Sequence, residues 1–530
     1  MKFSFICREP FSHVGRNIAV IGAGPAGLTV TGYFVCRGYN VDVYDKLPLP
    51  GGLMVFAIPR SRITLEEVIE GWRDLEQNFN VKFNMRTKVS LGEGSDEGDE
   101  FAEKKISLMD LSGKYDALIL ATGTWRSRRL GVEGENASNV VSALSFLYHR
   151  RLSELGLAKE GTSLNYRKVV VIGAGLSAVD AAEECVSMGV SEVYMVYRRS
   201  IKEAPAGSHR IRELFKSGVK WIELAQPKKI LTDGGYARGV EFLRVELGEP
   251  DETGRPRPKP IPGSEFILEA DLIIVAVGET STPPIYSGEL IKYLDNSGRI
   301  IVDANYRIPG TNIYAVGDVV TGPSKIGLAV DHALRAARVI DQSITGERIS
   351  VSTLLSKLKP VKQAVIKRTE WKPVYGEEIC KYLDTYNVFN YDKCLNASPF
   401  TRVFDYSKCM GCETCNAVCG FVHDGRSMIK INKLEDGLVY PTACLHCTNA
   451  SCQSVCKRKA ITRGELGEIV IDYKKCNKCL DCLTACPVKV IKLSRGDIVN
   501  CDLCSQLRKG GLEPACVSMC PSKAIILTYH

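Results

Sequence analysis

The sequence has no long hydrophobic run and few glutamines. Its longest apolar stretches, such as ALILA and LIIVAV, have the length of β-strands, whereas a helix that spans a membrane needs about 18 apolar residues. The first residues, MKFSFICREPF, lack the sustained apolar segment of a signal peptide. Six glutamines in 530 residues are a weak indication of a thermophilic source. We therefore expect no membrane span and a cytoplasmic protein.

Cysteine, in contrast, is abundant and concentrated near one end. Of 21 cysteines, 16 lie between Cys409 and Cys520. In an exported protein this density would predict disulfides. Without an export signal, and with repeated C-x2-C spacings, metal ligation in a reducing compartment is favoured.

The sixteen cysteines form four successive motifs. Three closely spaced cysteines wrap one four-iron cube, and the x3 step places the fourth on a helical turn that reaches a neighbouring cluster. Zinc ribbons are the alternative, but they need neither triple-cysteine runs nor a trailing Cys-Pro. The sequence therefore predicts four [4Fe-4S] clusters with these ligands: Cys409, Cys412, Cys415 and Cys419; Cys444, Cys447, Cys452 and Cys456; Cys476, Cys479, Cys482 and Cys486; Cys501, Cys504, Cys516 and Cys520.

The formal net charge of +8, from 69 Lys and Arg against 61 Asp and Glu, would by itself suggest a nucleic-acid partner. That count treats every cysteine as neutral. An oxidised four-iron cluster with four thiolates carries about −2, so four clusters add about −8. We therefore expect a holoprotein near neutrality and no nucleic-acid partner.

A glycine turn near the start predicts a dinucleotide site. Gly22, Gly24 and Gly27 form G-x-G-x-x-G between an apolar strand and a helix, and Asp45 closes the next strand. The first two glycines permit a tight turn and close approach of a pyrophosphate, and the third permits close packing of the helix. The helix N-terminus then faces the phosphates, and Asp45 accepts a hydrogen bond from a ribose hydroxyl.

A second βαβ unit begins about 150 residues later. Gly173, Gly175 and Ala178 form G-x-G-x-x-A, and the following strand ends in Arg198 and Arg199. A site specific for NAD usually has an acidic residue at this point, whereas arginine suits the 2′-phosphate of NADP. We therefore expect NADP(H) in preference to NAD(H).

Two further strand ends point to a flavin. One strand ends at Thr122-Gly123, and another ends at Gly317-Asp318 before a long amphipathic helix. A carboxylate at Asp318 can bind a ribityl hydroxyl, and the N-terminus of the helix can face a flavin ring that becomes negative on reduction.

These motifs carry a family resemblance. GAGPAGL, ATG and AVGDV are similar to two-dinucleotide flavoproteins, and PGGLMVFAIPRSRI and VYRRS resemble the small subunit of NADPH-dependent glutamate synthase over residues 15–345. The resemblance implies FAD, hydride transfer without a catalytic acid or base, and further lining residues: Gly51, Gly52, Ile58 and Pro59, Gly278 and Glu279. Disulfide reductases of this architecture have a redox cysteine pair near the flavin, whereas Cys36 and Cys185 each stand alone on a helix. Disulfide reduction is therefore not expected.

The cysteine-rich end resembles the four-cluster ferredoxin subunits of molybdenum and tungsten oxidoreductases and of hydrogenases, notably in CLHCTNASCQSVC. That resemblance implies that the first motif pairs with the fourth and the second with the third. Lys457 departs from it, since a proline often follows the second motif in these proteins. Glutamate synthase small subunits, moreover, carry their clusters before the flavin domain. Cys7, Cys380 and Cys394 have no assigned role.

We predict an α/β fold with two Rossmann-like dinucleotide-binding domains and a C-terminal bacterial-type polyferredoxin domain. The flavin domain comprises residues 1–123 and 279–345, the NAD(P)H domain 124–278, a partly helical linker 346–400 and the cluster domain 401–530. The acidic stretch 91–101 predicts a solvated hairpin loop, and the proline-rich stretch 251–263 a loop between strands.

The predicted function is an FAD- and iron–sulfur-containing NAD(P)H oxidoreductase subunit. It exchanges hydride with NAD(P)H at FAD and relays single electrons through the four clusters to or from a catalytic partner. We expect this partner to be a tungsten or molybdenum aldehyde-type oxidoreductase. A soluble ferredoxin is a further candidate partner. One alternative is the small subunit of a glutamate synthase. The other is a non-enzymatic ferredoxin carrier with a vestigial flavin domain.

Overall fold

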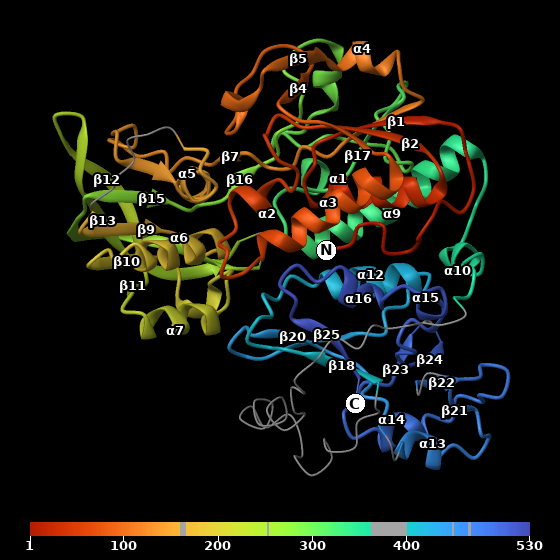
Figure 1. Ribbon diagram of the computed structural model, residues 1–530. Helices are drawn as coiled ribbons and strands as arrows, with labels where there is room; N and C mark the ends of the chain where they lie inside the picture. Colours follow the sequence, from red (N-terminus) through yellow and green to blue (C-terminus); the bar gives the residue numbers. More distant parts are fainter. Residues whose placement is uncertain are drawn as a thin grey trace.

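The computed structural model describes residues 1–158, 166–251, 254–361, 400–447, 450–464, 468–494 and 496–529. Two α/β parts lie side by side, and the cysteine-rich part packs beneath the first of them (Figure 1). No helix among the described residues is long and apolar enough to cross a membrane.

The first α/β part is built on a parallel sheet in the order β17-β6-β1-β2-β3. Its first strand, NIAVI, is apolar and almost wholly buried, as is typical of parallel strands covered on both faces. The strands are β1 (Asn17–Ile21), β2 (Asn40–Tyr44), β3 (Lys82–Asn84), β6 (Ala117–Leu120) and β17 (Ile313–Ala315). The last of them comes from far along the chain, so the sheet is assembled from two separate stretches of sequence.

The helix α1 (Pro25–Arg37) follows β1 and has clear ends. Pro25 takes the first helical position, where its missing N–H is not needed, and Gly38 ends the helix in the left-handed region with φ 87°. The helix α9 (Ile326–Thr345) packs along α1. Buried Asp341 on α9 accepts hydrogen bonds from Tyr33 and Tyr39 and pairs with Arg37 at 2.6 Å. This network fixes α9 on α1.

The second α/β part has a parallel sheet in the order β11-β10-β9-β15-β8. The helices α5 (Ala143–Glu154), α6 (Leu176–Ser187) and α7 (Ser208–Lys216) belong to it. Its strands are β8 (Val140–Ser142), β9 (Lys168–Ile172), β10 (Glu192–Val196), β11 (Lys220–Ile222) and β15 (Leu272–Val275). The chain passes between the two α/β parts twice. At these two points β7 (Arg126–Ser127) and β16 (Glu279–Thr280) pair as short antiparallel strands.

The prediction of a loop over 251–263 is wrong in its second half. The strand β14 (Pro256–Glu269) pairs with β13 (Tyr236–Pro250), which also pairs with β12 (Ala225–Asp233). Prolines at 256, 258 and 260 therefore lie in a strand. They are tolerated because β14 is the edge of this three-stranded sheet, where a missing N–H breaks no ladder.

The prediction of a solvated hairpin loop over 91–101 is wrong for its second half. Gly92, Glu93 and Ser95 are exposed, but the acidic side chains from Asp96 to Glu100 contact other segments of the chain. Asp96, 4% exposed, pairs with Arg126, and Glu100 accepts a hydrogen bond from Tyr148 on α5. Asp99 lies at the start of a short 3-10 helix, η1 (Asp99–Phe101), and pairs with lysines.

Cys36 on α1 is not isolated as expected, because it forms a disulfide with Cys7. Both residues are fully buried. Disulfides are rare in reducing compartments, except in proteins of hyperthermophiles. Cys185 is a buried free cysteine on α6, and Cys380 and Cys394 lie outside the described residues.

The cysteine-rich part closes on itself through β18 (Phe400–Phe404), which pairs with β25 (Ile525–Tyr529). Three hairpins lie between them: β19 (Lys430–Lys433) with β20 (Val439–Thr442), β21 (Ile461–Arg463) with β22 (Ile469–Ile471), and β23 (Lys492–Ser494) with β24 (Asp497–Val499). Its helices are α12 (Thr414–Val422), α13 (Ser451–Ser454), α14 (Asp481–Ala485), α15 (Ser505–Lys509) and α16 (Ala515–Ser518).

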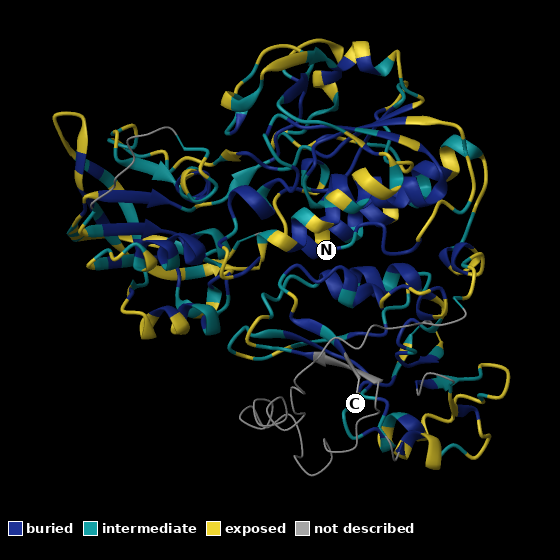
Figure 2. Cartoon of the chain, in the orientation of Figure 1, coloured by how far each residue is buried: buried dark blue, intermediate teal, exposed yellow. Residues whose placement is uncertain are grey.

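This part docks on the first α/β part through α12, which packs against α9. Phe421 of α12 meets the rings of Phe5 and Tyr33 edge-on, and α12 is mostly buried (Figure 2). The predicted linker contains α10 (Val351–Leu355), whose first N–H bonds to Asp424 at 3.0 Å. The rest of the linker, beyond residue 361, lies outside the described residues.

Candidate functional site

One cavity runs from the first glycine turn to the cysteine-rich part. Its walls come from the flavin-type turn, from the second α/β part and from the first cysteine motif. The lining includes Gly22, Gly24, Asp45, Gly52, Ile58, Arg62, Thr122, Gly123, Trp125, Ser177, Asp180, Glu279, Asp318, Lys325, Ile326, Met410 and Cys412. Residues of all three parts thus face one space.

The glycine turn at the centre of this cavity is closely packed on one side and open on the other. A Cβ on Gly22 would lie 2.5 Å from the carbonyl oxygen of Ala121, and one on Gly27 would lie 1.8 Å from that of Gly22. A Cβ on Gly24 would approach only Gly52, at 4.0 Å, and one on Gly123 would meet no protein atom within 4 Å. This is the cradle that a pyrophosphate requires at the N-terminus of α1.

Gly51 and Gly52 support the turn from the next loop. The N–H of Gly51 donates to the carbonyl of Ala23 at 2.8 Å, and Gly51 itself is buried under Val55. Gly52 approaches Gly24 and faces the cavity, as Ile58 does.

Asp45 holds the turn from the adjacent strand. Its carboxylate accepts hydrogen bonds from the N–H groups of Ala23, at 2.6 Å, and Leu47, at 2.9 Å. Burial raises the pKa of this carboxyl, and the backbone donors oppose that shift. Its contact with a ribose remains a prediction.

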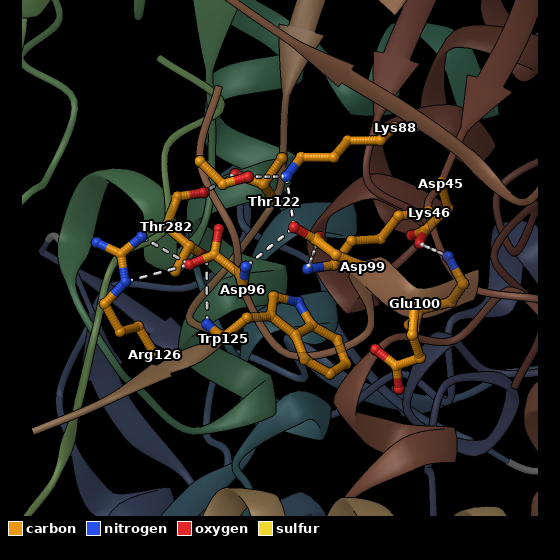
Figure 3. Close-up of polar contacts among 12 residues, drawn as sticks. Asp45, Lys46, Lys88, Asp96, Asp99, Glu100, Thr122, Trp125, Arg126 and Thr282 are labelled. Carbon is orange, nitrogen blue, oxygen red and sulfur yellow. Dashed lines mark hydrogen bonds and ion pairs between the residues drawn. The ribbon is translucent and has the colours of Figure 1, made fainter. Parts of the chain in front are cut away.

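A second pocket adjoins this cavity and shares Gly22, Asp45, Thr122 and Trp125 with it. Lys46 and Lys88 of β4 (Thr87–Ser90) both pair with Asp99, the former at 2.8 Å, and Trp125 lies beside them (Figure 3). Asp96 and Asp99 line this second pocket, so the acidic stretch forms part of its wall, a role that its composition did not reveal.

Asp318 and the N-terminus of α9 form another part of the cavity wall. The Asp318 carboxylate accepts from the Ser324 hydroxyl at 2.6 Å, and burial raises its pKa. Ile326 and Ala329, in the first turn of α9, line the cavity, so the positive end of the helix dipole faces it. The N–H of Gly317 donates to Nδ1 of His332 at 2.9 Å, which fixes the strand end on the helix.

The second glycine turn brings α6 to the same cavity. A Cβ on Gly173 would lie 2.2 Å from the carbonyl oxygen of Ala276, whereas Gly175 has open space. Ala178 is fully buried on α6. Ser177 donates to Glu279 at 3.1 Å, and burial raises the pKa of Glu279. Its neighbour Gly278, with φ 109°, permits the turn after β15.

The two α/β parts are joined at this point by a buried ion pair. Arg62, before α3 (Leu65–Phe79), donates from Nη1 to both carboxylate oxygens of Asp180 on α6, at 2.5 and 2.6 Å. The two side chains are 7% and 6% exposed. Both residues line the cavity. No sequence motif indicates this pair, because its members lie 118 residues apart.

The two predicted phosphate-binding arginines have different environments. Arg199 is 4% exposed, pairs with Asp251 at 2.8 Å and donates to the carbonyl of Pro256 at 2.7 Å. Arg198 is exposed. Arg199 is therefore tied into the protein, and Arg198 is the one of the two that is accessible to a ligand.

The first cysteine motif completes the cavity wall. Met410 and Cys412 line it, and the N–H of Gly327 on α9 donates to the carbonyl of Cys412 at 3.1 Å. Lys325 donates to the carbonyl of Gly411 at 3.2 Å. The loop that holds the first cysteines thus rests directly on the helix that faces the Asp318 end.

The cysteines themselves gather in sets that mix distant motifs. Burial raises the pKa of the Cys415 thiol, and Cys409, Cys412, Cys516 and Cys520 raise it further. The pKa of Cys504 is raised by burial and, among others, by Cys419, Cys501 and Cys516. The first motif therefore lies against the fourth.

The second and third motifs combine in the same way. The pKa of Cys452 is raised by burial and then by Cys486, Cys447 and Cys482. That of Cys482 is raised by burial and then by Cys476, Cys479 and Cys456. Each motif thus sends its last cysteine toward the triplet of its partner.

We name the four sets by their order from the cavity. The proximal set lies at the cavity because Cys412 lines it. Neighbouring sets are identified by pairs of cysteines that act on each other's pKa. These pairs are Cys415 with Cys516 (proximal and second sets), Cys444 with Cys501 (second and third sets) and Cys452 with Cys482 (third and distal sets). The sets are proximal (Cys409, Cys412, Cys415, Cys520), second (Cys419, Cys501, Cys504, Cys516), third (Cys444, Cys447, Cys452, Cys486) and distal (Cys456, Cys476, Cys479, Cys482).

Known proteins match this architecture in two separate regions. The model of the pyridine nucleotide-disulphide oxidoreductase family matches residues 16–333, and that of the 4Fe-4S dicluster domain matches residues 435–529. The structure of FprA from Mycobacterium tuberculosis in complex with NADPH superposes with a TM-score of 0.51 at 19% identity, covering 65% of this chain and 90% of that one. This likeness shows the fold.

Two relatives illustrate the range of the match. The beta subunit of the NADP(+)-dependent formate dehydrogenase of Moorella thermoacetica is 32% identical over 333 residues, which cover 62% of this chain and 44% of that subunit. The small chain of the NADPH glutamate synthase of Escherichia coli (strain K12) is 32% identical over 332 residues, which cover 61% and 67%.

The family match, the two glycine turns and the cysteine motifs agree with the predicted fold and class. The chain belongs to the pyridine nucleotide-disulphide oxidoreductase family, and its C-terminal part matches the 4Fe-4S dicluster domain.

Proposed function

We propose that this chain passes electrons between NADP(H), at FAD, and a partner protein through four [4Fe-4S] clusters. The observation that carries this proposal is the shared cavity: Cys412 of the proximal set lines the same space as Gly24 and Asp318. A cluster held there would lie next to the flavin, so no diffusing carrier is needed between them.

The residues present fit FAD. The open side of Gly24 and the N-terminus of α1 would hold the pyrophosphate, Asp45 and the β4 end the adenosine, and Asp318 with the start of α9 the ribityl chain and ring. Bound FAD would take a hydride from the nicotinamide and release electrons singly, which suits clusters that carry one electron each.

The chain's own residues position this chemistry. The Arg62–Asp180 pair holds the nicotinamide-binding part against the flavin-binding part, and Ser177 and Glu279 close the side of the cavity that α6 faces. The dipole of α9 would favour negative charge on the ring. Cys7 and Cys36 are not among the lining residues, which supports electron transfer rather than disulfide exchange.

The four sets form a row that suits a relay. In each pair of neighbouring sets, a cysteine of one set raises the pKa of a cysteine of the other. The distal set includes the exposed Cys479. Electrons would enter at the proximal set and leave at the distal set, or run in reverse.

The terminal reaction would belong to a partner. The formate dehydrogenase and glutamate synthase relatives are named as subunits or chains of larger enzymes, which supports a catalytic partner here. A molybdenum or tungsten oxidoreductase fits the ferredoxin-like half of the chain, whereas the position of the clusters after the flavin-binding half speaks against a glutamate synthase.

Cofactor content tests the proposal directly. Anaerobically purified protein should contain about sixteen iron atoms and one FAD per chain, and NADPH should bleach both flavin and cluster absorbance. Iron, acid-labile sulfide and flavin assays measure this. About four irons, or stoichiometric zinc, would contradict the four-cluster relay.

The choice of nicotinamide depends on Arg198. Arg198→Ala should raise the KM for NADPH by about tenfold or more, because it removes a charged hydrogen-bond partner of the 2′-phosphate. The KM for NADH should hardly change. Arg199→Ala should instead lower stability, since it leaves Asp251 and the Pro256 carbonyl without this partner. Equal losses with both cofactors in the Arg198 variant would refute the assignment.

A further inference from the structure

The distal set lies at the end of the cysteine-rich part that is remote from the flavin-binding part. It is built on α13 and α14, which pack together below the rest of the molecule (Figure 1). Cys479 is exposed, and Cys456 and Cys476 are partly exposed, whereas the third set has no fully exposed member. A cluster here would be the one most open to another protein.

Basic side chains surround this end. Cys456 is followed by three consecutive basic residues, and Cys476 and Cys479 are flanked by three lysines, so the two segments meet around one set of thiols. We call these six residues the basic rim; all are exposed: Lys457, Arg458, Lys459, Lys474, Lys475 and Lys478.

Few acidic groups neutralise the basic rim within the described residues. Lys475 pairs with Asp472 at 3.4 Å and Lys478 with Asp497 at 3.0 Å. For the other four members, the described part of the chain contains no acidic side chain within ion-pair distance. Surface cations of this kind create a field that steers acidic partners.

Two exposed apolar side chains lie in the same segment. Tyr473 is 49% exposed and Leu480, next to Cys479, is 43% exposed. An apolar centre within a charged rim is the usual composition of a protein–protein interface, and the tyrosine is of a type enriched at such contacts.

We propose that the basic rim is the docking surface for a separate protein that presents an acidic face around its own one-electron centre. The distal cluster and that centre exchange one electron per encounter, and no proton or bond change is needed. The inference rests on the proposed relay, because it assigns the point where the relay opens to a partner. It also explains why basic residues flank the cysteines of the distal set.

A charge-reversal pair tests this inference in the full chain. The test variant is Lys457→Glu with Lys459→Glu and Lys474→Glu. The matched control is Lys104→Glu with Lys105→Glu and Lys114→Glu, three exposed lysines in β5 (Lys104–Ser107) and just after α4 (Leu108–Ser112), at the opposite end of the molecule. Both variants change the net charge equally. The probe is an acidic bacterial-type ferredoxin reduced anaerobically by NADPH.

The test variant should reduce the ferredoxin at least about tenfold more slowly at low salt, because steering of this kind raises association rates by about 10–10³. The difference should shrink towards 1 M salt, where the Debye length is about 3 Å. The control should stay within about twofold of the unmodified protein. In both variants, NADPH should still bleach the flavin and the clusters.

The outcomes separate the two proposals. Equal effects of the test and control variants, or no salt dependence, would overturn the docking surface and leave the relay intact. Failure of NADPH to bleach the clusters of the unmodified protein would instead overturn the relay. Binding of phosphatidylglycerol vesicles that only the test variant loses, with ferredoxin reduction unchanged, would assign the rim to a lipid surface and also overturn the inference.

Discussion

Replacing Cys520 by alanine should separate hydride transfer from cluster reduction. Cys520 comes from the last motif, yet it belongs to the proximal set with Cys409, Cys412 and Cys415. NADPH should still bleach the flavin at about the unmodified rate, because Cys520 is not among the residues that line the cavity. Reduction of the remaining clusters should slow by more than about 100-fold. Loss of a group that only hydrogen-bonds to a metal ligand typically costs about 10–100-fold, and Cys520 would be a ligand itself.

Stopped-flow absorbance and EPR after mixing with NADPH would measure both rates. Cys185→Ala is the matched control, since it removes a buried free thiol of α6 that belongs to no motif. It should change neither rate. If a folded, FAD-loaded Cys520 variant loses flavin reduction, or if its clusters are reduced as fast as before, the entry of electrons at the proximal set is refuted.

Arg62→Met should destabilise the protein by about 3–5 kcal/mol, because it removes the close partner of the buried Asp180 carboxylate and leaves Arg210 at 3.9 Å. Arg60→Met is the control. Arg60 pairs with Glu154, but its side chain is 48% exposed, and such surface pairs contribute about 0–1 kcal/mol. Urea unfolding, followed by FAD release and by tryptophan fluorescence, measures the difference.

The loss in the Arg62 variant should depend on pH. Burial raises the pKa of Asp180, so the folded protein binds this proton more tightly than the unfolded chain does. The penalty for the buried carboxylate is therefore fully present above the folded pKa and disappears as the pH falls towards the unfolded value of about 3.9. Arg62→Met with Asp180→Leu should recover most of the stability, since an apolar pair needs no counter-charge. A loss of stability no larger than that of the Arg60 control would contradict the proposed role of the Arg62–Asp180 pair.

Much of the site could be predicted from short sequence motifs, because their chemistry is local. The turn at Gly22 needs positive φ and no Cβ, and Pro25 and Gly38 mark the ends of its helix. The cysteine spacings depend on how far a few residues can reach around a cube. These features indicate cofactor classes wherever the segment lies in the fold.

Predictions from local composition were wrong where contacts with distant segments determine the structure. The composition of the acidic stretch 91–101 predicts a solvated loop, but Lys46, Lys88 and Arg126 pair with Asp96 and Asp99 in its second half. The prolines of 256–260 read as a loop, but an edge position admits them into a strand. In each case the partner is distant in sequence and leaves no trace in the segment itself.

The sequence alone predicted which groups this protein binds: two dinucleotides and iron–sulfur clusters, from glycine and cysteine spacings within a few turns of chain. Only the tertiary structure decided how they connect. It placed Cys412 on the cavity through α9, withdrew Arg199 into a pair with Asp251, joined Arg62 to Asp180 and left Cys479 at the surface. These features depend on residues that are far apart in the sequence, and no local periodicity encodes how they pack.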